Sequence, residues 1–200
     1  MGAIMNDRTI FDSVDRWNQK YRTDERFQDV PVRKLVRENS HLLPPSGLAL
    51  EIAGGMGATT DFLQRRGLNV VEVDISHTAL SKALQINPAP VYIQADACKM
   101  PIKPMQFDVI CNFYFLERSV FDFIKSYLKP GGLLFFECMF VDMLSVRPDI
   151  HPERLLHRNE LAEVYSEWET VFFFEGWTDS DHGKRKAISQ LIARKPLTSV

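Results

Sequence analysis

The sequence has few cysteines and little net charge, and each shortage excludes a class of protein. Cys98, Cys111 and Cys138 are odd in number and form no Cys-x-x-Cys pair, so they predict buried free thiols in a reducing compartment rather than a disulfide framework. The 26 acidic and 24 basic residues leave a net charge of only -2, and no broad basic face is predicted. We therefore expect no sequence-independent binding of nucleic acid.

The chain also lacks long apolar stretches. Residues 1–8 contain no apolar segment of the kind found in signal peptides, and Asn6 breaks the N-myristoylation pattern. The longest apolar runs, such as 109–116, are too short to span a bilayer. We expect a soluble, cytoplasmic protein without a membrane partner. Its 200 residues, 45% of them hydrophobic, predict a single domain with a core large enough to fold without disulfides.

The most informative stretch runs from a strand through a glycine-rich turn into a helix. Residues 48–52 form a short apolar run typical of a buried parallel strand, and residues 59–66 continue at helical spacing. The turn between them contains Gly54, Gly55 and Gly57. Glycine permits unusual backbone angles and lets a ligand approach bare backbone. The stretch therefore predicts a ligand site at the carboxyl end of a strand, where open α/β sheets bind ligands.

Acidic residues end the next two predicted strands. Residues 70–74 end in Asp74, and residues 91–96 end in Asp96. An acid after the second strand can accept hydrogen bonds from the ribose hydroxyls of an adenosine, and an acid after the third can reach the adenine edge. The alternative is that each acid only caps the helix that follows it. Three strand ends in this order favour the adenosine site.

The N-terminal part predicts helices that precede this unit. Residues 7–21 have the spacing of an amphipathic helix, and Trp17 and Tyr21 lie four residues apart on one face of it. Pro31 suits the first turn of a second helix, which must end before Pro44.

The rest of the chain alternates helix and strand patterns and then changes. Alternation up to residue 140 predicts a parallel sheet with right-handed crossovers, and the apolar strand 107–112 predicts a central position in it. The last two strands have the spacing of an antiparallel hairpin at the sheet edge. The further elements predicted are a helix capped by Ser76, a loop over 99–105, a helix over 120–128 ended by residues 129–132, a strand over 133–140, a helix over 160–165, and strands over 168–175 and 187–193.

Five blocks in order make the chain resemble the class I S-adenosylmethionine (SAM)-dependent methyltransferases over residues 30–195. The blocks are Leu50-Glu-Ile-Ala-Gly-Gly-Met-Gly57, Val71-Glu-Val-Asp-Ile-Ser76, Gln94-Ala-Asp-Ala-Cys-Lys-Met-Pro101, Phe107-Asp-Val-Ile110 and Leu128-Lys-Pro-Gly-Gly132. The resemblance implies an α/β, Rossmann-like doubly wound fold, with a mostly parallel seven-stranded sheet, an antiparallel last strand and N-terminal lid helices. It divides one methyltransferase domain, 1–200, into cap helices (1–45), a cofactor-binding core (46–140) and an acceptor-side segment with the edge hairpin (141–200).

Within the class, the aromatic pair in Trp17-Asn-Gln-Lys-Tyr21 and the segment Tyr114-Phe-Leu-Glu117 are similar to the tellurite-resistance and thiopurine methyltransferase branch. One departure is Ala53, which stands where the family usually has the first glycine of its turn. Alanine is expected to be tolerated there only if its φ angle is negative.

Carried over residue by residue, the resemblance implies a cofactor site. Glu51 and the backbone of residues 53–57 would hold the methionine ammonium, Asp74 the ribose, and Asp96 the adenine amino group. The cofactor-binding residues so implied are Trp17, Tyr21, Glu51, Ala53, Gly54, Gly55, Gly57, Asp74, Ile75, Asp96, Ala97, Asn112 and Phe113.

Trp17 and Tyr21 suggest a hypothesis of our own. An aromatic lid over a sulfonium gains cation–π attraction of about 0.5–2 kcal/mol. The product, S-adenosylhomocysteine (SAH), has no charge on sulfur, so such a lid would hold the methyl donor more tightly than the product. The alternative is that the two rings only pack the first helix onto the sheet.

The sequence says less about the methyl acceptor than about the cofactor. Methyl transfer needs alignment rather than a nucleophilic side chain or a metal, and no metal site is expected. A small molecule such as a thiol or metalloid oxyanion is expected as acceptor. Arg147, Arg154 and Arg185 could hold an anionic one, or they could be solvated surface charges. If a proton must leave the acceptor, the candidate bases are Tyr114, His151 and His182.

Two other functions stay open at this point. A nucleotide-dependent oxidoreductase would use Gly55, Gly57 and Asp74 in a similar way, but Thr60 replaces the third glycine of that fingerprint. A regulatory protein could bind SAM without transferring its methyl group, because this chemistry requires no catalytic residue that a sequence would reveal.

Overall fold

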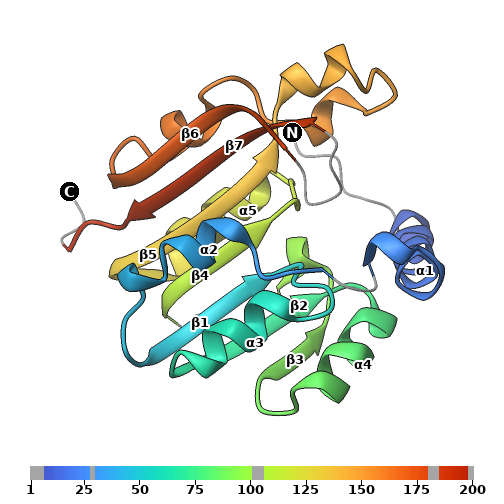
Figure 1. Ribbon diagram of the computed structural model, residues 1–200, viewed down its shortest axis with the longest axis horizontal. Helices are drawn as coiled ribbons and strands as arrows, with labels where there is room; N and C mark the ends of the chain where they lie inside the picture. The colour runs from blue at the N-terminus through green and yellow to red at the C-terminus, as the bar shows by residue number, and fades with distance from the viewer. Residues whose placement is uncertain (1–6, 28–29, 101–105, 180–184, 198–200) are drawn as a thin grey trace.

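The computed structural model describes residues 7–27, 30–100, 106–179 and 185–197. Seven strands form one sheet in the order β3-β2-β1-β4-β5-β7-β6 (Figure 1). The strands are β1 (Gly47–Ile52), β2 (Leu68–Asp74), β3 (Val91–Gln94), β4 (Phe107–Phe113), β5 (Leu128–Met139), β6 (Glu169–Asp179) and β7 (Arg185–Arg194). The α-helices are α1 (Asp7–Thr23), α2 (Lys34–Glu38), α3 (Ala58–Arg65), α4 (His77–Ile86), α5 (Ser119–Tyr127) and α6 (Glu160–Val164).

The sheet has the predicted architecture. Strands β1 to β5 pair in parallel, β4 is the central strand, and β7 runs antiparallel to both β5 and β6. The mostly parallel seven-stranded sheet and the antiparallel edge hairpin are therefore confirmed. Within the part of the chain that the structure describes, no helix combines the length and apolar character needed to cross a membrane.

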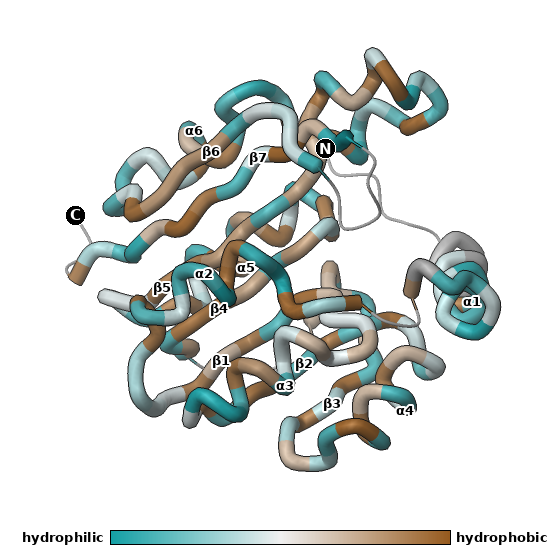
Figure 2. Tube along the Cα trace, in the orientation of Figure 1, coloured by the Kyte–Doolittle hydropathy of each residue, from teal (hydrophilic) through white to brown (hydrophobic). Residues whose placement is uncertain are grey.

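Helices cover both faces of the sheet, so the central strands are buried on both sides. Leu50 and Ile52 of β1 lie in one apolar cluster with residues of α5 and α6, whereas Ala49 lies in a second cluster with residues of α2 and α3. Figure 2 shows hydrophobic stretches along the strands and a largely hydrophilic α1. The continuous apolar runs of the sequence follow from this two-sided burial.

The first helix, α1, packs against α4 beyond the carboxyl ends of β1 and β2 (Figure 1). The side-chain oxygen of Asn18 accepts hydrogen bonds from the Ser76 hydroxyl, at 2.9 Å, and from the Thr78 amide, at 3.0 Å. The Lys82 ammonium donates to the Tyr21 carbonyl at 2.6 Å. Ser76 also caps α4 as predicted, since its side chain accepts from the Ala79 amide. The predicted lid helix is thus fixed to the element that follows Asp74.

Several boundaries differ from the sequence predictions. Strand β3 ends at Gln94, two residues before Asp96. Residues 129–132 do not separate α5 from a later strand, because β5 already begins at Leu128 and these residues form an irregularity between its pairings with Phe107 and Val109. The hairpin strands extend further into the polar segment than predicted, to Asp179 and from Arg185. Hydrogen bonding along the hairpin overrides the low strand propensity of that segment.

The cysteine prediction was correct for two of three residues. Cys111 and Cys138 are buried free thiols, but Cys98 is exposed. Cys98 lies in a short 3-10 helix (Ala97–Lys99) after β3, where the chain returns to the surface.

Candidate cofactor and acceptor site

Polar side chains replace the apolar ones toward the sheet edge formed by the carboxyl ends of the parallel strands, on β1, β2, β5 and the antiparallel β7. On the face covered by α2 and α3, Ala49, Val70, Phe135 and Ile192 belong to the apolar cluster. Two residues nearer the carboxyl edge on each strand, the same face carries Glu51, Glu72, Glu137 and Gln190, respectively. The three glutamates are buried. Because buried charges are costly unless they have partners, this row marks the edge as a site for charged ligands or for proton storage.

The glycine turn has the backbone that a ligand cradle needs. Gly55 and Gly57 have φ angles of 71° and 74°, a region that favours glycine. A Cβ atom on Gly54 would lie 2.6 Å from the side-chain Cδ of Glu72, so only glycine fits there. The expectation for Ala53 was wrong: its φ angle is 54°, not negative. The turn imposes this angle, while the Ala53 amide donates to the Val73 carbonyl at 2.7 Å.

Asp74 connects the glycine turn with the end of β2. Its two carboxylate oxygens accept hydrogen bonds from the amide of Gly55, at 2.9 Å, and from the amide of Ser76, at 2.8 Å. Burial raises the pKa of Asp74 to about 6, although both amides oppose the shift. Each carboxylate oxygen has a second acceptor position, so two ribose hydroxyls can bind without displacing either amide. Asp74 does not cap α4, because Ser76 does.

Glu51 lies on the neighbouring strand, fully within the protein. The Thr60 hydroxyl donates to its Oε2 atom at 2.6 Å. Burial raises the pKa of Glu51 to about 7, while the Thr60 hydrogen bond and the positive charge of Arg33 act in the opposite direction. A cationic ligand group beside Glu51 would favour its ionised form.

Glu72 is a buried carboxyl group below the glycine turn that sequence reasoning did not select. It is paired with Glu51 in the register of β1 and β2, and neither of its oxygens has a hydrogen-bond partner among the described residues. Burial and the neighbouring Glu51 raise its pKa well above the ordinary value. Its neutral form is therefore favoured over its ionised form. The sequence hid it, because a glutamate inside an apolar strand resembles a surface position.

The aromatic pair of α1 lies over the glycine turn. The ring centroids of Trp17 and Tyr21 are 6.1 Å apart, and Phe27 stands edge-on to both, at 6.0 and 5.3 Å. The Tyr21 hydroxyl lies against Gly55, where an added Cβ would collide with it. A ligand lying on this turn would bind the hydroxyl or displace it. One face of Trp17 is occupied by the Lys20 ammonium, at 4.4 Å from the ring centroid.

Arg33 is a second site residue that sequence reasoning missed. Its guanidinium lies 5.0 Å from the ring centroid of Tyr114 and 6.0 Å from that of Phe113. Its charge acts on the pKa of Glu51 and of Tyr21, which places it between the glycine turn and β4. Among the described residues it has no hydrogen-bond or ion-pair partner. No motif announces it, because a single arginine before a short helix is common.

The predicted adenine contacts lie at the neighbouring strand end. Ile75 is partly exposed after Asp74, and Ala97 is buried. Asp96 does cap the following 3-10 helix, since one of its oxygens accepts from the Cys98 amide at 2.9 Å. The alternative interpretation of Asp96 as a helix cap is therefore correct, whether or not Asp96 also binds a ligand.

Asn112 and Phe113 close the end of β4 and are both buried. The Asn112 amide group donates to the Phe115 carbonyl at 2.8 Å, and its side-chain oxygen has no partner among the described residues.

A polar network begins at the next residue. The Tyr114 hydroxyl donates to Oε1 of Glu137 and accepts from the Lys186 ammonium. The other oxygen of Glu137 accepts from the Gln190 amide group at 2.6 Å. Burial and the Glu137 charge raise the pKa of Tyr114, so its hydroxyl stays protonated in the free protein.

The late basic candidates do not gather in one place. Arg147 forms an exposed ion pair with Asp149 at 2.7 Å, Arg154 is exposed, and Arg185 lies over the Trp177 ring at 5.4 Å. These contacts fit solvated surface charges. His151 is exposed, and its Nδ1 accepts weakly from the Glu153 amide at 3.4 Å. His182 lies outside the described residues.

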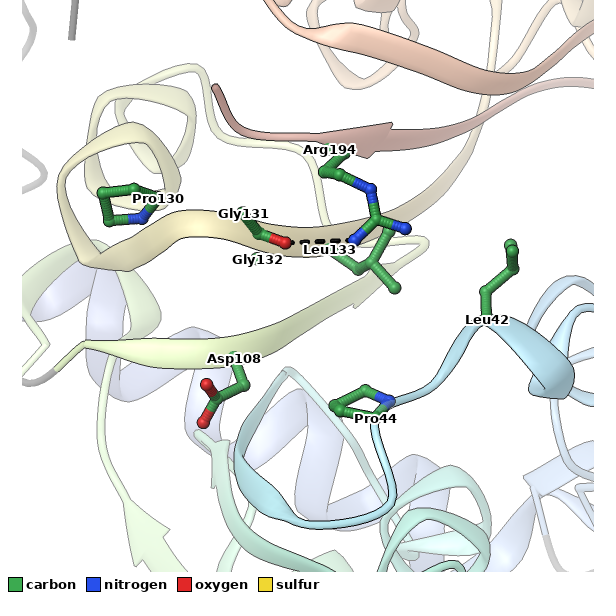
Figure 3. Close-up of a pocket in the computed structure, with 8 residues that line it drawn as sticks. All are labelled: Leu42, Pro44, Asp108, Pro130, Gly131, Gly132, Leu133 and Arg194. Carbon is green, nitrogen blue, oxygen red and sulfur yellow. Dashed lines mark hydrogen bonds between the residues drawn. The ribbon is translucent and has the colours of Figure 1, made fainter. Parts of the chain in front are cut away.

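A surface pocket lies at the opposite end of β4 and β5 (Figure 3). Its one carboxylate, Asp108, is already held by the Lys129 ammonium and the Leu48 amide, at 2.9 and 2.8 Å. Arg194 is held by the Gly131 carbonyl at 3.1 Å. Both charged side chains among the described residues that line this pocket are therefore paired, and the carboxyl edge is the candidate site.

Comparison with known proteins finds similarity to methyltransferases. Residues 50–136 match a family model described as a methyltransferase domain. An uncharacterized methyltransferase of Synechocystis sp. is 28% identical over 117 residues, which are 55% of this chain and 52% of the relative. A malonyl-[acyl-carrier protein] O-methyltransferase of Enterobacter lignolyticus is 24% identical over 161 residues, or 74% of this chain and 60% of the relative. The chain thus spans about half to three fifths of these relatives.

The fold has close counterparts among solved structures. TehB from Haemophilus influenzae superposes with a TM-score of 0.70 at 19% identity, covering 91% of this chain and 66% of that protein. At this identity the likeness concerns the fold. The Rossmann-like architecture expected from the five sequence blocks is confirmed.

Proposed function

We propose that the chain is a class I SAM-dependent methyltransferase that transfers a methyl group from SAM to a small-molecule acceptor, because residues 50–136 match a methyltransferase family model and the sheet has the strand order expected for that class. The observation that carries the proposal is the cradle formed by the glycine turn and Asp74. Gly55 presents its amide to Asp74, and the positive φ angles of Gly55 and Gly57 turn bare backbone toward the carboxyl edge. This is the geometry that a nucleoside with a charged tail requires.

The described residues suit each part of SAM. Asp74 would accept the ribose hydroxyls, with Ile75 against the adenine and Asp96 and Ala97 at its edge. Glu51 would hold the ammonium of the methionine part. Arg33, a guanidinium without an internal partner, is suited to its carboxylate.

The chain's own contribution to the reaction is alignment. When bound, SAM supplies an electrophilic methyl carbon on a positively charged sulfur. Asn112 and Phe113 would form the floor below that sulfur, and Trp17 and Tyr21 the lid. Holding donor and acceptor in line can lower the barrier by about 7–11 kcal/mol.

The acceptor in this proposal is a small molecule of the thiol or metalloid oxyanion kind, and the resemblance of the Trp17 and Tyr21 segment to the tellurite-resistance and thiopurine methyltransferase branch supports it. Nucleic acid is not expected, since the net charge is -2. The buried thiols suit a cytoplasmic site of action.

A binding and turnover experiment tests the proposal. Calorimetric titration is expected to give saturable binding of SAM and none of NADH. The protein is then incubated with SAM and panels of thiols, metalloid oxyanions, phenols and carboxylates, and SAH formation is measured. Binding of NADH in place of SAM would favour an oxidoreductase. Tight SAM binding with no SAH from any panel would favour a regulatory protein.

A further inference from the structure

The Tyr114–Glu137–Lys186 network has no part in cofactor binding as proposed. We propose that it removes the proton of a protic acceptor, with Tyr114 as the catalytic residue and Glu137 and Lys186 as positioning residues that act through it. The inference rests on the proposed methyl transfer and narrows its acceptor to small molecules that carry a proton on the attacking atom, such as phenols or un-ionised thiols, in place of metalloid oxyanions.

The hydrogen bonds run in one direction across the network. Lys186 donates to the Tyr114 oxygen, and Tyr114 donates to Glu137. Gln190 fixes the far oxygen of Glu137, and Lys186 lies 3.6 Å from the near one. The side chain of Glu137 is only 6% exposed and that of Lys186 20%. Because the Tyr114 hydroxyl donates to a buried carboxylate, its oxygen can take up one more proton while its own proton passes to Glu137.

The backbone of Tyr114 is in an unusual conformation. Its φ angle is 58°, which is strained for a bulky residue, and its amide still donates to the Glu137 carbonyl at 2.8 Å. This angle turns the chain at the tip of β4 while leaving the ring on the Glu137 side. Of the three non-glycine residues with positive φ in the described ranges, two, Ala53 and Tyr114, lie at this edge of the sheet. Such strain is typical of functional sites.

The network borders the position expected for the methyl group. Tyr114 directly follows Phe113, and Arg33 lies over both rings. Arg33 in turn influences Glu51, on the cofactor side. Going along the edge, the groups run from Asp74 and Glu51 through Arg33 to Tyr114 and Lys186. The Tyr114 oxygen therefore lies on the acceptor side.

The proposed step balances without any further reactant. As the acceptor atom bonds to the methyl carbon, the carbon–sulfur bond breaks and leaves its electron pair on sulfur. The acceptor's proton passes to the Tyr114 oxygen, and the Tyr114 hydroxyl proton passes to Oε1 of Glu137. Tyr114 never becomes a free tyrosinate, which agrees with its raised pKa. The Lys186 ammonium lies 3.6 Å from Oε1 of Glu137, the oxygen that receives the proton.

This chemistry distinguishes acceptor classes. A phenol carries a proton that must leave, whereas an ionised thiol or a metalloid oxyanion does not. General base assistance is worth about 100-fold or more where a proton must be moved. The network would have no role for an acceptor that arrives already ionised.

Turnover with a matched pair of probes tests the proposal. Phenol, and thiophenol at a pH where it is ionised, are compared in the wild type, in Tyr114→Phe and in the control Tyr127→Phe. We expect Tyr114→Phe to lower kcat for phenol about 100-fold and kcat for thiophenolate less than about 3-fold. In Glu137→Gln, the residual rate with phenol should rise with pH as the phenol ionises by itself. Equal losses with both probes, or methylation of no protic probe, would overturn the proposal.

A binding measurement tests it without turnover. With SAH present, the affinity for 4-fluorophenol is measured by fluorine NMR. Tyr114→Phe is expected to weaken binding about 3- to 10-fold through loss of one hydrogen bond, while SAM affinity stays unchanged. Unchanged 4-fluorophenol affinity would contradict the proposal. Failure of SAM itself to bind the wild type would instead refute the proposed function.

Discussion

Glu51 and Glu72 stand side by side on adjacent parallel strands, directly paired in register and buried on the same face of the sheet. Two carboxylates at this spacing cannot both ionise at low cost away from water. They flank Thr60, whose hydroxyl donates to Glu51, and Glu72 touches the glycine turn from below. The pair therefore stores at least one proton beneath the cofactor cradle in the free protein.

This pair makes the stability of the free protein depend on pH. The folded-state pKa values of Glu51 and Asp74 are raised to about 7 and 6, and that of Glu72 is raised well above its ordinary value. Between pH 4 and 7 the folded state thus holds more protons than the unfolded state. The free energy of unfolding of the protein therefore falls as the pH rises through this range.

Replacing Glu72 tests this relation. Glu72→Gln is expected to be close to wild type at pH 4 and more stable at pH 7 by about 1.4 kcal/mol or more, the equivalent of one pKa unit. Urea unfolding at both pH values measures it, with the exposed Glu167→Gln as control. If wild type and Glu72→Gln lost the same amount of stability as the pH rises, the claim that Glu51 and Glu72 hold a proton between them would be contradicted.

Cofactor affinity is expected to depend on pH in the opposite sense. A cationic group next to Glu51 favours its ionised form, so binding of SAM should release a proton. The affinity for SAM should rise about tenfold or more between pH 5.5 and 8, because at higher pH Glu51 is already ionised and no longer has to give up a proton when SAM binds. Calorimetry in buffers of different ionisation enthalpy measures the protons released. Proton uptake on binding would contradict this prediction.

The strained turn gives a stability prediction. Ala53 has a φ angle of 54°, a conformation that costs a non-glycine residue about 1–2 kcal/mol. Ala53→Gly should therefore raise the free energy of unfolding by about 1 kcal/mol, after allowing for the added freedom of glycine in the unfolded chain. Ala58→Gly, at the start of α3, is the matched control and should be destabilising. Destabilisation by both substitutions would show that the turn does not strain Ala53.

The lid gives a prediction about charge recognition. Trp17→Ala should lower the affinity for SAM about 2- to 30-fold more than the affinity for SAH, if the ring faces the sulfonium. Lys20 covers one face of Trp17, so only the other face is available for this contact. Calorimetry with both ligands decides, with Phe27→Ala as the control from the same aromatic cluster. Equal losses for SAM and SAH would leave Trp17 as a packing residue only.

The sequence predicted the strands and their alternation with helices, because buried parallel strands and glycine turns leave local patterns, and it pointed to the same sheet edge that we propose as the ligand site. The position of Asp74 at a strand end and the Ser76 cap could be inferred in the same way. Glu72, Arg33 and Glu137 could not, because each acts through neighbours on other strands or helices. The φ angle of Ala53 was also hidden, since alanine normally signals an ordinary backbone.

The boundary errors have a common physical origin. Pro130 and the glycines beside it indicate a break, yet β5 continues through an irregularity because β4 and β7 pair with it on both sides. The sequence pattern predicted that Asp96 ends a strand. In the structure Asp96 follows the end of β3 by two residues and caps a 3-10 helix. Tertiary pairing and capping, rather than local propensity, fix these ends.

The most direct test of the account is a calorimetric titration of SAM into the wild type, Asp74→Asn and the exposed control Asp149→Asn. The account predicts one SAM bound per chain, affinity lowered about 10- to 100-fold in Asp74→Asn through weakened charge-assisted hydrogen bonds to the ribose, and no change in Asp149→Asn. Absence of SAM binding by the wild type, or equal affinity in Asp74→Asn, would contradict it.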